Sequence, residues 1–195
     1  MKSHLRGVKL VLYSYIMGVF LSWASYPVLI HFTFIVPLEI SQSIYTIIAT
    51  IALLIFLYLT LYDFGEKDRR PFIKEAYEGK GFVCGAIGFL IIVLAEVLII
   101  ALANKYVLVR HPHLVISNVN NYIRLILYMP FYWLYQLLDP MAGVVPRVEY
   151  LTSLVPGVLL IPVSGFGYLR GLSGKKIFNK SLDEIKKKFV YKGDK

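Results

Sequence analysis

Long apolar runs separated by short polar segments dominate the chain. A helix needs about 20 apolar residues to cross a bilayer, and four runs reach that length. They cover about residues 10–30, 42–62, 82–103 and 150–169. Backbone polar groups in lipid have to bond to one another, so each run is expected to be an α-helix. The pattern predicts an all-α class: a polytopic transmembrane helical bundle over residues 1–169, followed by a basic cytoplasmic tail over residues 170–195.

Composition supports a membrane protein. Hydrophobic residues make up 57% of the 195 residues and charged residues 17%. Soluble domains are about 45–50% apolar and about 25% charged. The single cysteine, Cys84, cannot form an internal disulfide and says nothing about the redox compartment.

A fifth apolar stretch, residues 122–138, is short and contains Arg124 and Pro130. Lys and Arg number three before the first run, none in the first linker, five in the second, two in the third and nine in the tail. The positive-inside rule then places both termini and the second linker in the cytoplasm. An even number of crossings follows, so we expect 122–138 to be an interfacial or re-entrant helix on the outer side.

Two alternatives to this topology stay open. In one, residues 122–138 cross the membrane and the tail lies outside. In the other, the first run is a signal peptide cleaved near Ser22-Trp23-Ala24. We favour retention of this run in the mature protein because it is long for a signal peptide.

The last run contains Pro156 and Pro162, which predict either a kink or a break that lines a polar cavity.

Glu96 is the only charged residue of the third run and the main candidate for chemistry. A carboxylate at membrane depth costs several kcal/mol unless it is paired or neutral, so it should face the bundle. Gly81, Gly85 and Gly88 precede it on the same helical stripe. Small residues on such a stripe let helices approach closely, so we expect these glycines to be helix-packing positions.

Two sets of partners are available to Glu96. Arg124 lies early in the outer stretch, and Thr46 and Thr50 lie at a matching depth in the second run. We therefore expect an intramembrane polar cluster of Glu96 with Arg124 or with Thr46 and Thr50. The functional interpretation is a proton- or cation-coupled site. The structural interpretation, which we favour, is an ion pair or a protonated, hydrogen-bonded glutamate.

The tail has the pattern of an amphipathic helix. Ser181 and Glu184 fit a capping box, and the acidic residues that follow Ser181 precede lysines at i+4. We expect this helix to lie on anionic lipid through Lys186, Lys187 and Lys188. We therefore attribute the net charge of +9 to basic residues of the cytoplasmic segments. Since no nucleic-acid-binding module is present, we expect no nucleic-acid partner.

Two further stretches carry a resemblance. One is Asp63-Phe64-Gly65-Glu66-Lys67-Asp68-Arg69 with Gly79-Lys80-Gly81-Phe82 and Gly85, and the other runs from Ile161 to Gly171. Together with residues 121–139 they resemble small multi-spanning membrane proteins that recur, without assigned function, in Firmicutes-type bacteria. The resemblance implies the span order and a bacterial plasma membrane. It implies no substrate or reaction.

No enzyme motif emerges from the chain. It has no G-x-S-x-G elbow, H-E-x-x-H helix or P-loop, so we expect no catalytic, metal or cofactor site. The favoured function is a non-enzymatic accessory or structural component of a bacterial membrane system. The alternative is a transporter or channel subunit that uses Glu96, and a membrane enzyme ranks third. The partner is left open between a larger membrane protein and a second copy of the chain.

Overall fold

The computed structural model describes residues 2–32, 38–69, 76–110, 116–138 and 152–174, and all secondary structure within them is helical. The long helices are α1 (Lys2–Phe32), α2 (Leu38–Asp68), α3 (Lys80–Arg110) and α6 (Val155–Ser173). Shorter elements are α4 (Ile116–Leu127), the 3₁₀ turn η1 (Met129–Phe131), α5 (Tyr132–Leu138) and the 3₁₀ turn η2 (Thr152–Leu154).

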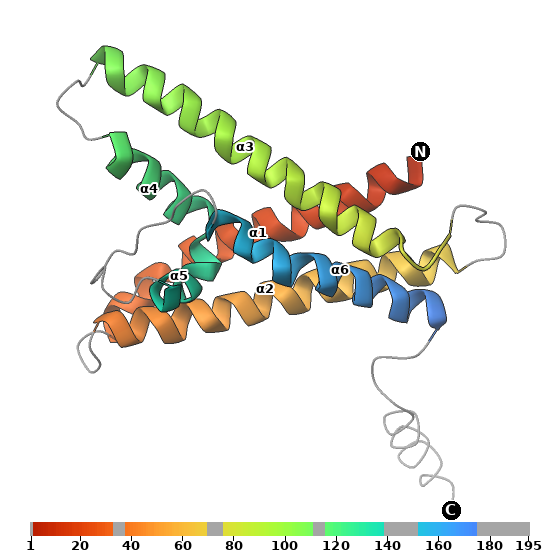
Figure 1. The fold of residues 1–195 in the computed structure, drawn as a ribbon. Coiled ribbons are helices and arrows are strands. Elements are labelled where there is room, and N and C mark those ends of the chain that lie inside the picture. The colour runs from red at the N-terminus through yellow and green to blue at the C-terminus, as the bar shows by residue number, and fades with distance from the viewer. Residues whose placement is uncertain (1, 33–37, 70–75, 111–115, 139–151, 175–195) are drawn as a thin grey trace, which may run out of the picture.

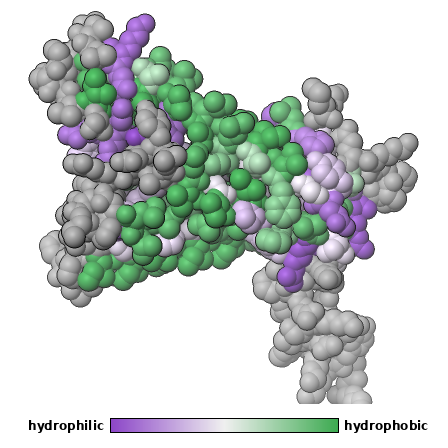
Figure 2. Space-filling view, viewed as in Figure 1, coloured by the Kyte–Doolittle hydropathy of each residue, from purple (hydrophilic) through white to green (hydrophobic). Residues whose placement is uncertain are grey.

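Within the part of the chain that the structure describes, four helices are long and apolar enough to cross a membrane. Their qualifying segments are Ser3–Pro27, Ile40–Asp68, Lys80–Val107 and Val155–Ser173. The all-α class and the four apolar helices are therefore confirmed. Figure 2 shows an apolar surface over the middle of the molecule, with hydrophilic side chains gathered toward its two ends.

The helices extend beyond the apolar runs. α1 begins at Lys2 and ends at Phe32, on both sides of the first run, and α2 continues through the charged residues up to Asp68. At about 1.5 Å per residue, a helix of 31 residues is about 46 Å long. That length matches a bilayer with its headgroup layers, about 40–45 Å, rather than its hydrocarbon core alone. α6 likewise ends at Ser173, four residues inside the range assigned to the tail.

One end of the bundle collects four helix ends. The first residues of α1 and α3 lie beside the last turns of α2 and α6 (Figure 1), where Lys80 contacts both Ser3 and Asp68. We call this the Lys80 end and the opposite one the Glu96 end. α6 packs against α2 and α3, and α1 packs against the same two helices. Four alternating helices return the chain to the end at which it starts.

The glycine stripe of α3 lies in two helix contacts. A Cβ on Gly81 would lie 2.8 Å from the carbonyl oxygen of Ser164, and one on Gly85 would lie 2.9 Å from the Ser164 Cβ. Both glycines thus face α6. A Cβ on Gly88 would lie 2.7 Å from a methyl carbon of Val11, so this glycine faces α1. All three positions allow a closer approach of the helices than a larger residue would.

The α2–α6 contact uses glycines of α6. A Cβ on Gly167 would lie 2.6 Å from the carbonyl oxygen of Tyr58, and a Cβ on Gly171 would overlap that of Tyr62. α6 runs unbroken through Pro162, and Pro156 lies in its first turn, where a missing N–H costs nothing. The break that the prolines suggested is absent from the helix.

Residues 116–138, here called the broken segment, differ from the single helix expected over 122–138. Helix α4 begins six residues earlier, at Ile116, and ends at Leu127. The turn η1, which contains Pro130, separates it from α5. With 12 residues α4 is about 18 Å long, too short to cross a core of about 30 Å. The broken segment packs against α1, α2 and α3 at the Glu96 end (Figure 1).

Candidate functional site

Glu96 lies in a buried ion pair. Its Oε1 accepts a hydrogen bond of 2.7 Å from Nε of Arg124, and its Oε2 accepts one of 2.9 Å from the Tyr128 hydroxyl. The exposed fractions are 1% for Glu96, 5% for Arg124 and 0% for Tyr128. Of the two partner sets expected for Glu96, the structure brings Arg124 into contact with it.

The end of α4 positions both donors. Arg124 and Tyr128 are four residues apart, which places them on one face, and the Tyr128 N–H donates to the Arg124 carbonyl at 2.9 Å. Tyr128 is completely buried, and its hydroxyl is a proton donor to the Glu96 carboxylate. This tyrosine was not among the expected partners of Glu96, although its i+4 spacing from Arg124 was a usable signal.

Thr46 and Thr50, the other expected partners of Glu96, donate hydrogen bonds to other groups. The Thr46 hydroxyl donates to the carbonyl of Gln42 in its own helix, at 2.8 Å. The Thr50 hydroxyl donates to the carbonyl of Pro130, and Nε1 of Trp133 donates to the Thr50 oxygen at 2.9 Å. Thr50 therefore holds the turn of the broken segment rather than Glu96.

Two side chains of α1 satisfy the end of α4. The last carbonyls of a helix have no partner within it and need one from elsewhere. The Tyr15 hydroxyl donates to the Leu127 carbonyl at 2.8 Å, and Nε1 of Trp23 donates to the Ile126 carbonyl at 3.1 Å. Each of α1, α2 and α3 therefore contributes polar contacts to the broken segment. Irregular backbone at membrane depth is tolerated where protein covers it in this way.

Three tyrosine rings pack beside the ion pair. The ring centroids of Tyr15 and Tyr128 are 6.5 Å apart, and those of Tyr128 and Tyr135 are 6.3 Å apart, both edge-to-face. All three rings are buried. This geometry favours aromatic contact and keeps the Glu96 carboxylate in a dry environment.

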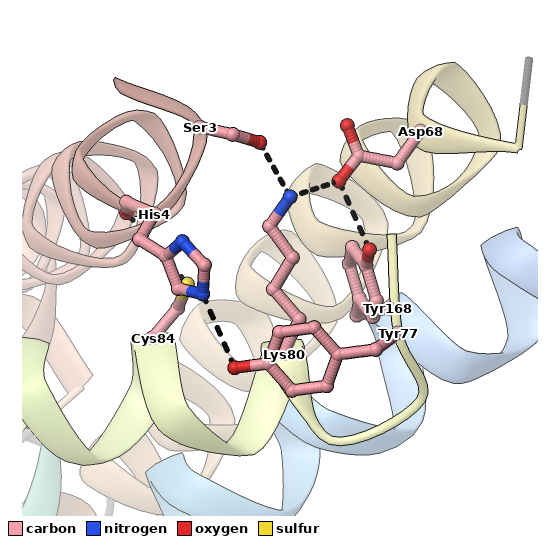
Figure 3. Close-up of polar contacts among 7 residues, drawn as sticks. All are labelled: Ser3, His4, Asp68, Tyr77, Lys80, Cys84 and Tyr168. Atoms are coloured by element: carbon pink, nitrogen blue, oxygen red, sulfur yellow. Dashed lines mark hydrogen bonds and ion pairs between the residues drawn. The ribbon is translucent and has the colours of Figure 1, made fainter. Parts of the chain in front are cut away.

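A second buried cluster lies at the Lys80 end (Figure 3). Lys80 is 0% exposed, and its Nζ donates to Oδ2 of Asp68 at 2.6 Å and to the Ser3 hydroxyl. The Tyr168 hydroxyl donates to the same Asp68 oxygen at 2.9 Å. Four helices, α1, α2, α3 and α6, contribute one residue each. Nothing in the sequence pattern predicted this cluster.

Aromatic rings surround the buried ammonium of that cluster. Nζ of Lys80 lies 5.1 Å from the ring centroid of Phe64 and 5.9 Å from that of Tyr168. Cation–π attraction of this kind partly replaces lost hydration. Close by, Nε2 of His4 and the Tyr77 hydroxyl share a hydrogen bond of 3.1 Å, which connects α1 to the residues before α3. The arrangement ties helix ends together.

The remaining expectations concern the tail and metal ligands. Lys186, Lys187 and Lys188 lie outside the described residues, as does the whole expected tail helix. Within the described ranges, no three His, Cys, Asp or Glu side chains come close enough to hold a metal ion.

Comparison with known proteins adds no family. No family model matches the sequence, and neither the curated proteins nor the solved structures give a match. The function of the chain therefore has to be inferred from its own residues.

Proposed function

We propose that this protein is a non-enzymatic structural or accessory component of a bacterial plasma membrane. Its four apolar helices fit a membrane protein. Three polar side chains of the Glu96 end, Glu96, Thr50 and Tyr15, hold the broken segment. The resemblance to small Firmicutes-type membrane proteins supports the bacterial setting.

The proposal depends on the hydrogen bonds that both oxygens of the Glu96 carboxylate accept. Both of its oxygens accept hydrogen bonds, one from a guanidinium and one from a protonated phenol. A carboxylate that carries protons or cations across a membrane has to exchange its partner for water or for the ion. Since the partner here is a fixed cation, Arg124, a structural role is favoured over the transporter or channel alternative.

The distribution of basic residues supports the orientation. The N-terminal segment and the second linker, which meet at the Lys80 end, hold eight Lys and Arg against two in the third linker. The positive-inside rule then favours a cytoplasmic Lys80 end with both termini inside. In this orientation the tail reaches anionic lipid through Lys186, Lys187 and Lys188, and a larger membrane protein or a second copy of the chain is the partner.

Flux measurements test the structural role against transport. Purified full-length protein is reconstituted in liposomes that contain a pH-sensitive dye, under an imposed proton or cation gradient. We expect no flux above that of protein-free liposomes. Flux through the wild-type protein that Glu96→Gln abolishes would overturn the proposal and establish a transporter, and wild-type flux alone contradicts it even if the variant fails to fold.

Purification from native membranes tests the accessory role. The tagged protein is extracted in mild detergent after cross-linking, and the abundance of its companions is measured. We expect one membrane protein at near-stoichiometric amount, with the wild type and with a double variant, Glu96→Gln with Arg124→Met, that removes both buried charges. Recovery of the chain without any such companion would contradict an accessory role.

A further inference from the structure

A seam of two hollows runs between α1 and α2. The hollow nearer the Lys80 end has a volume of about 300 Å³. Its walls are Arg6, Leu10, Phe56, Leu59, Thr60, Asp63, Phe64 and Lys67. A second hollow of about 380 Å³ continues along the same two helices toward the Glu96 end, and Phe56 lines both. We call the first of these the charged hollow.

The charged hollow has the depth of one lipid leaflet. Phe56 and Lys67 lie at its two ends on α2, and the eleven helical steps from one to the other span about 16 Å. Half of the hydrocarbon core is about 15 Å. Where the hollow meets the second one, the rings of Tyr13 and Phe56 pack with centroids 6.4 Å apart. Phe56 therefore lies near the bilayer midplane when Lys67 lies at the headgroups.

The mouth of this hollow carries a net positive charge. Arg6 and Lys67 face Asp63 there, and all three side chains are exposed. Among the described residues, neither Arg6 nor Lys67 takes part in a hydrogen bond or ion pair. They differ in this from Lys80, whose charge Asp68 already balances. The two cations at the mouth are therefore available to an anion.

Deeper in the hollow the lining is apolar except for Thr60, whose hydroxyl donates to the Phe56 carbonyl at 2.7 Å. Leu10 of α1 and Phe56 and Leu59 of α2 form its walls below the charged mouth. A cation pair at headgroup level above an apolar channel of leaflet depth matches an amphiphile with an anionic head. A volume near 300 Å³ is at the lower limit for a ligand pocket, so it holds one acyl chain rather than a whole lipid.

We propose that the charged hollow is a binding site for an anionic glycerophospholipid of the phosphatidylglycerol class. Arg6 and Lys67 bind its phosphate, and one acyl chain lies along Leu10 and Leu59 toward Phe56. The Asp63 carboxylate at the same mouth opposes the phosphate, and the two cations outweigh it by one positive charge. This site goes beyond the proposed function and takes from it only the side of the membrane that supplies the lipid.

Native mass spectrometry of the full chain tests the site. The protein is purified with an equal mixture of phosphatidylglycerol and phosphatidylethanolamine, and the retained lipid is identified and counted. We expect one phosphatidylglycerol per chain. Arg6→Gln and Lys67→Gln should each lower the retained fraction about fivefold, the effect of one basic residue beside an anionic leaflet. Lys9→Gln is the matched control, because Lys9 is exposed on the same helix but does not line the hollow.

A second variant tests the acyl chain. Leu59→Trp fills the apolar part of the hollow without a change of charge, so we expect a similar loss of lipid. An equal loss with Lys9→Gln, equal retention of phosphatidylethanolamine, or unchanged retention in Leu59→Trp would overturn the site. So would a lipid-free dimer as the main species, which would show that a second copy covers the seam. None of these readouts depends on ion flux or on a companion protein.

Discussion

The buried charged side chains of the described residues form two pairs of opposite sign. Glu96 pairs with Arg124, and Asp68 pairs with Lys80. In each pair a tyrosine hydroxyl donates to the carboxylate as well. A buried charge without a partner costs several kcal/mol, whereas a pair with an extra donor recovers much of that cost. Both ends of the bundle thus contain a buried ion pair whose carboxylate also accepts a hydrogen bond from a tyrosine.

The first pair predicts strong coupling between Glu96 and Arg124. Glu96→Gln or Arg124→Met alone leaves one buried charge uncompensated, so each should lower the free energy of unfolding by about 3–5 kcal/mol. The double variant removes both charges and should be more stable than either single variant. Unfolding in mixed detergent micelles, followed by circular dichroism, measures the cycle.

The control for this cycle is Lys105→Met. Lys105 is an exposed cation on the same helix as Glu96, so its replacement should change the unfolding free energy by no more than about 0.5 kcal/mol. If the effects of Glu96→Gln and Arg124→Met simply add in the double variant, the two side chains are not energetically coupled.

The sequence predicted the buried pair of Glu96 and Arg124 but not the pair of Asp68 and Lys80. Glu96 is isolated in a long apolar run and so requires a partner, and Arg124 is the only cation of the weakest stretch. Lys80 stands at the edge of a run, where an unpaired lysine at the headgroups looks equally natural. Only the packing of four helices shows that Asp68 reaches it. The role of Thr50 was hidden for a similar reason, because it depends on the turn at Pro130.

At the scale of the element, α6 is the shortest of the four long helices and packs between α2 and α3. Its 19 residues include glycines at the contact with α2, where backbone meets backbone. In lipid no hydrophobic force draws helices together, so close van der Waals packing of small residues stabilises the contact. α6 can therefore lie this close to α2 only because glycines, which have no side chain, occupy the contact.

Gly167→Ala tests this dependence. The new Cβ would lie 2.6 Å from the carbonyl oxygen of Tyr58, which belongs to the backbone and cannot rotate away. We expect a loss of about 1–3 kcal/mol in the free energy of unfolding, measured in the same micelles. Gly79→Ala is the control, since its Cβ would meet only the Tyr77 ring at 3.4 Å. Equal stability of the two variants would contradict tight α2–α6 packing.

The apolar runs predicted the long helices but not the broken segment. Runs of about 20 apolar residues leave little choice but a helix in lipid. The start of α4 lies in a polar stretch with Asn118, Asn120 and Asn121, where no apolar run marks a helix. The apolar residues of α4 lie on one face of a helix that is too short to be stable alone. Tertiary contacts from α1 and α3 stabilise this helix.

At the scale of the whole molecule, four alternating helices bring distant parts of the chain to one end. Ser3, Asp68, Lys80 and Tyr168 meet there, where the first residues of α1 and α3 lie beside the last turns of α2 and α6 (Figure 1). The charge count predicted an even number of crossings, and the four long helices agree with it. Which side of the membrane the Lys80 end faces depends on the charge rule alone.

Cysteine labelling in intact cells decides that side. Glu78 and Lys105 are exposed at opposite ends of the molecule, and Cys84 is buried, so the wild-type chain serves as an unlabelled control. We expect a membrane-impermeant maleimide to modify Lys105→Cys in intact cells and Glu78→Cys only after lysis. The expectation follows from eight basic residues in the N-terminal segment and the second linker of the sequence, against two in the third linker. The reverse labelling would place the Lys80 end outside and would make the outer leaflet the source of any lipid bound between Arg6 and Lys67.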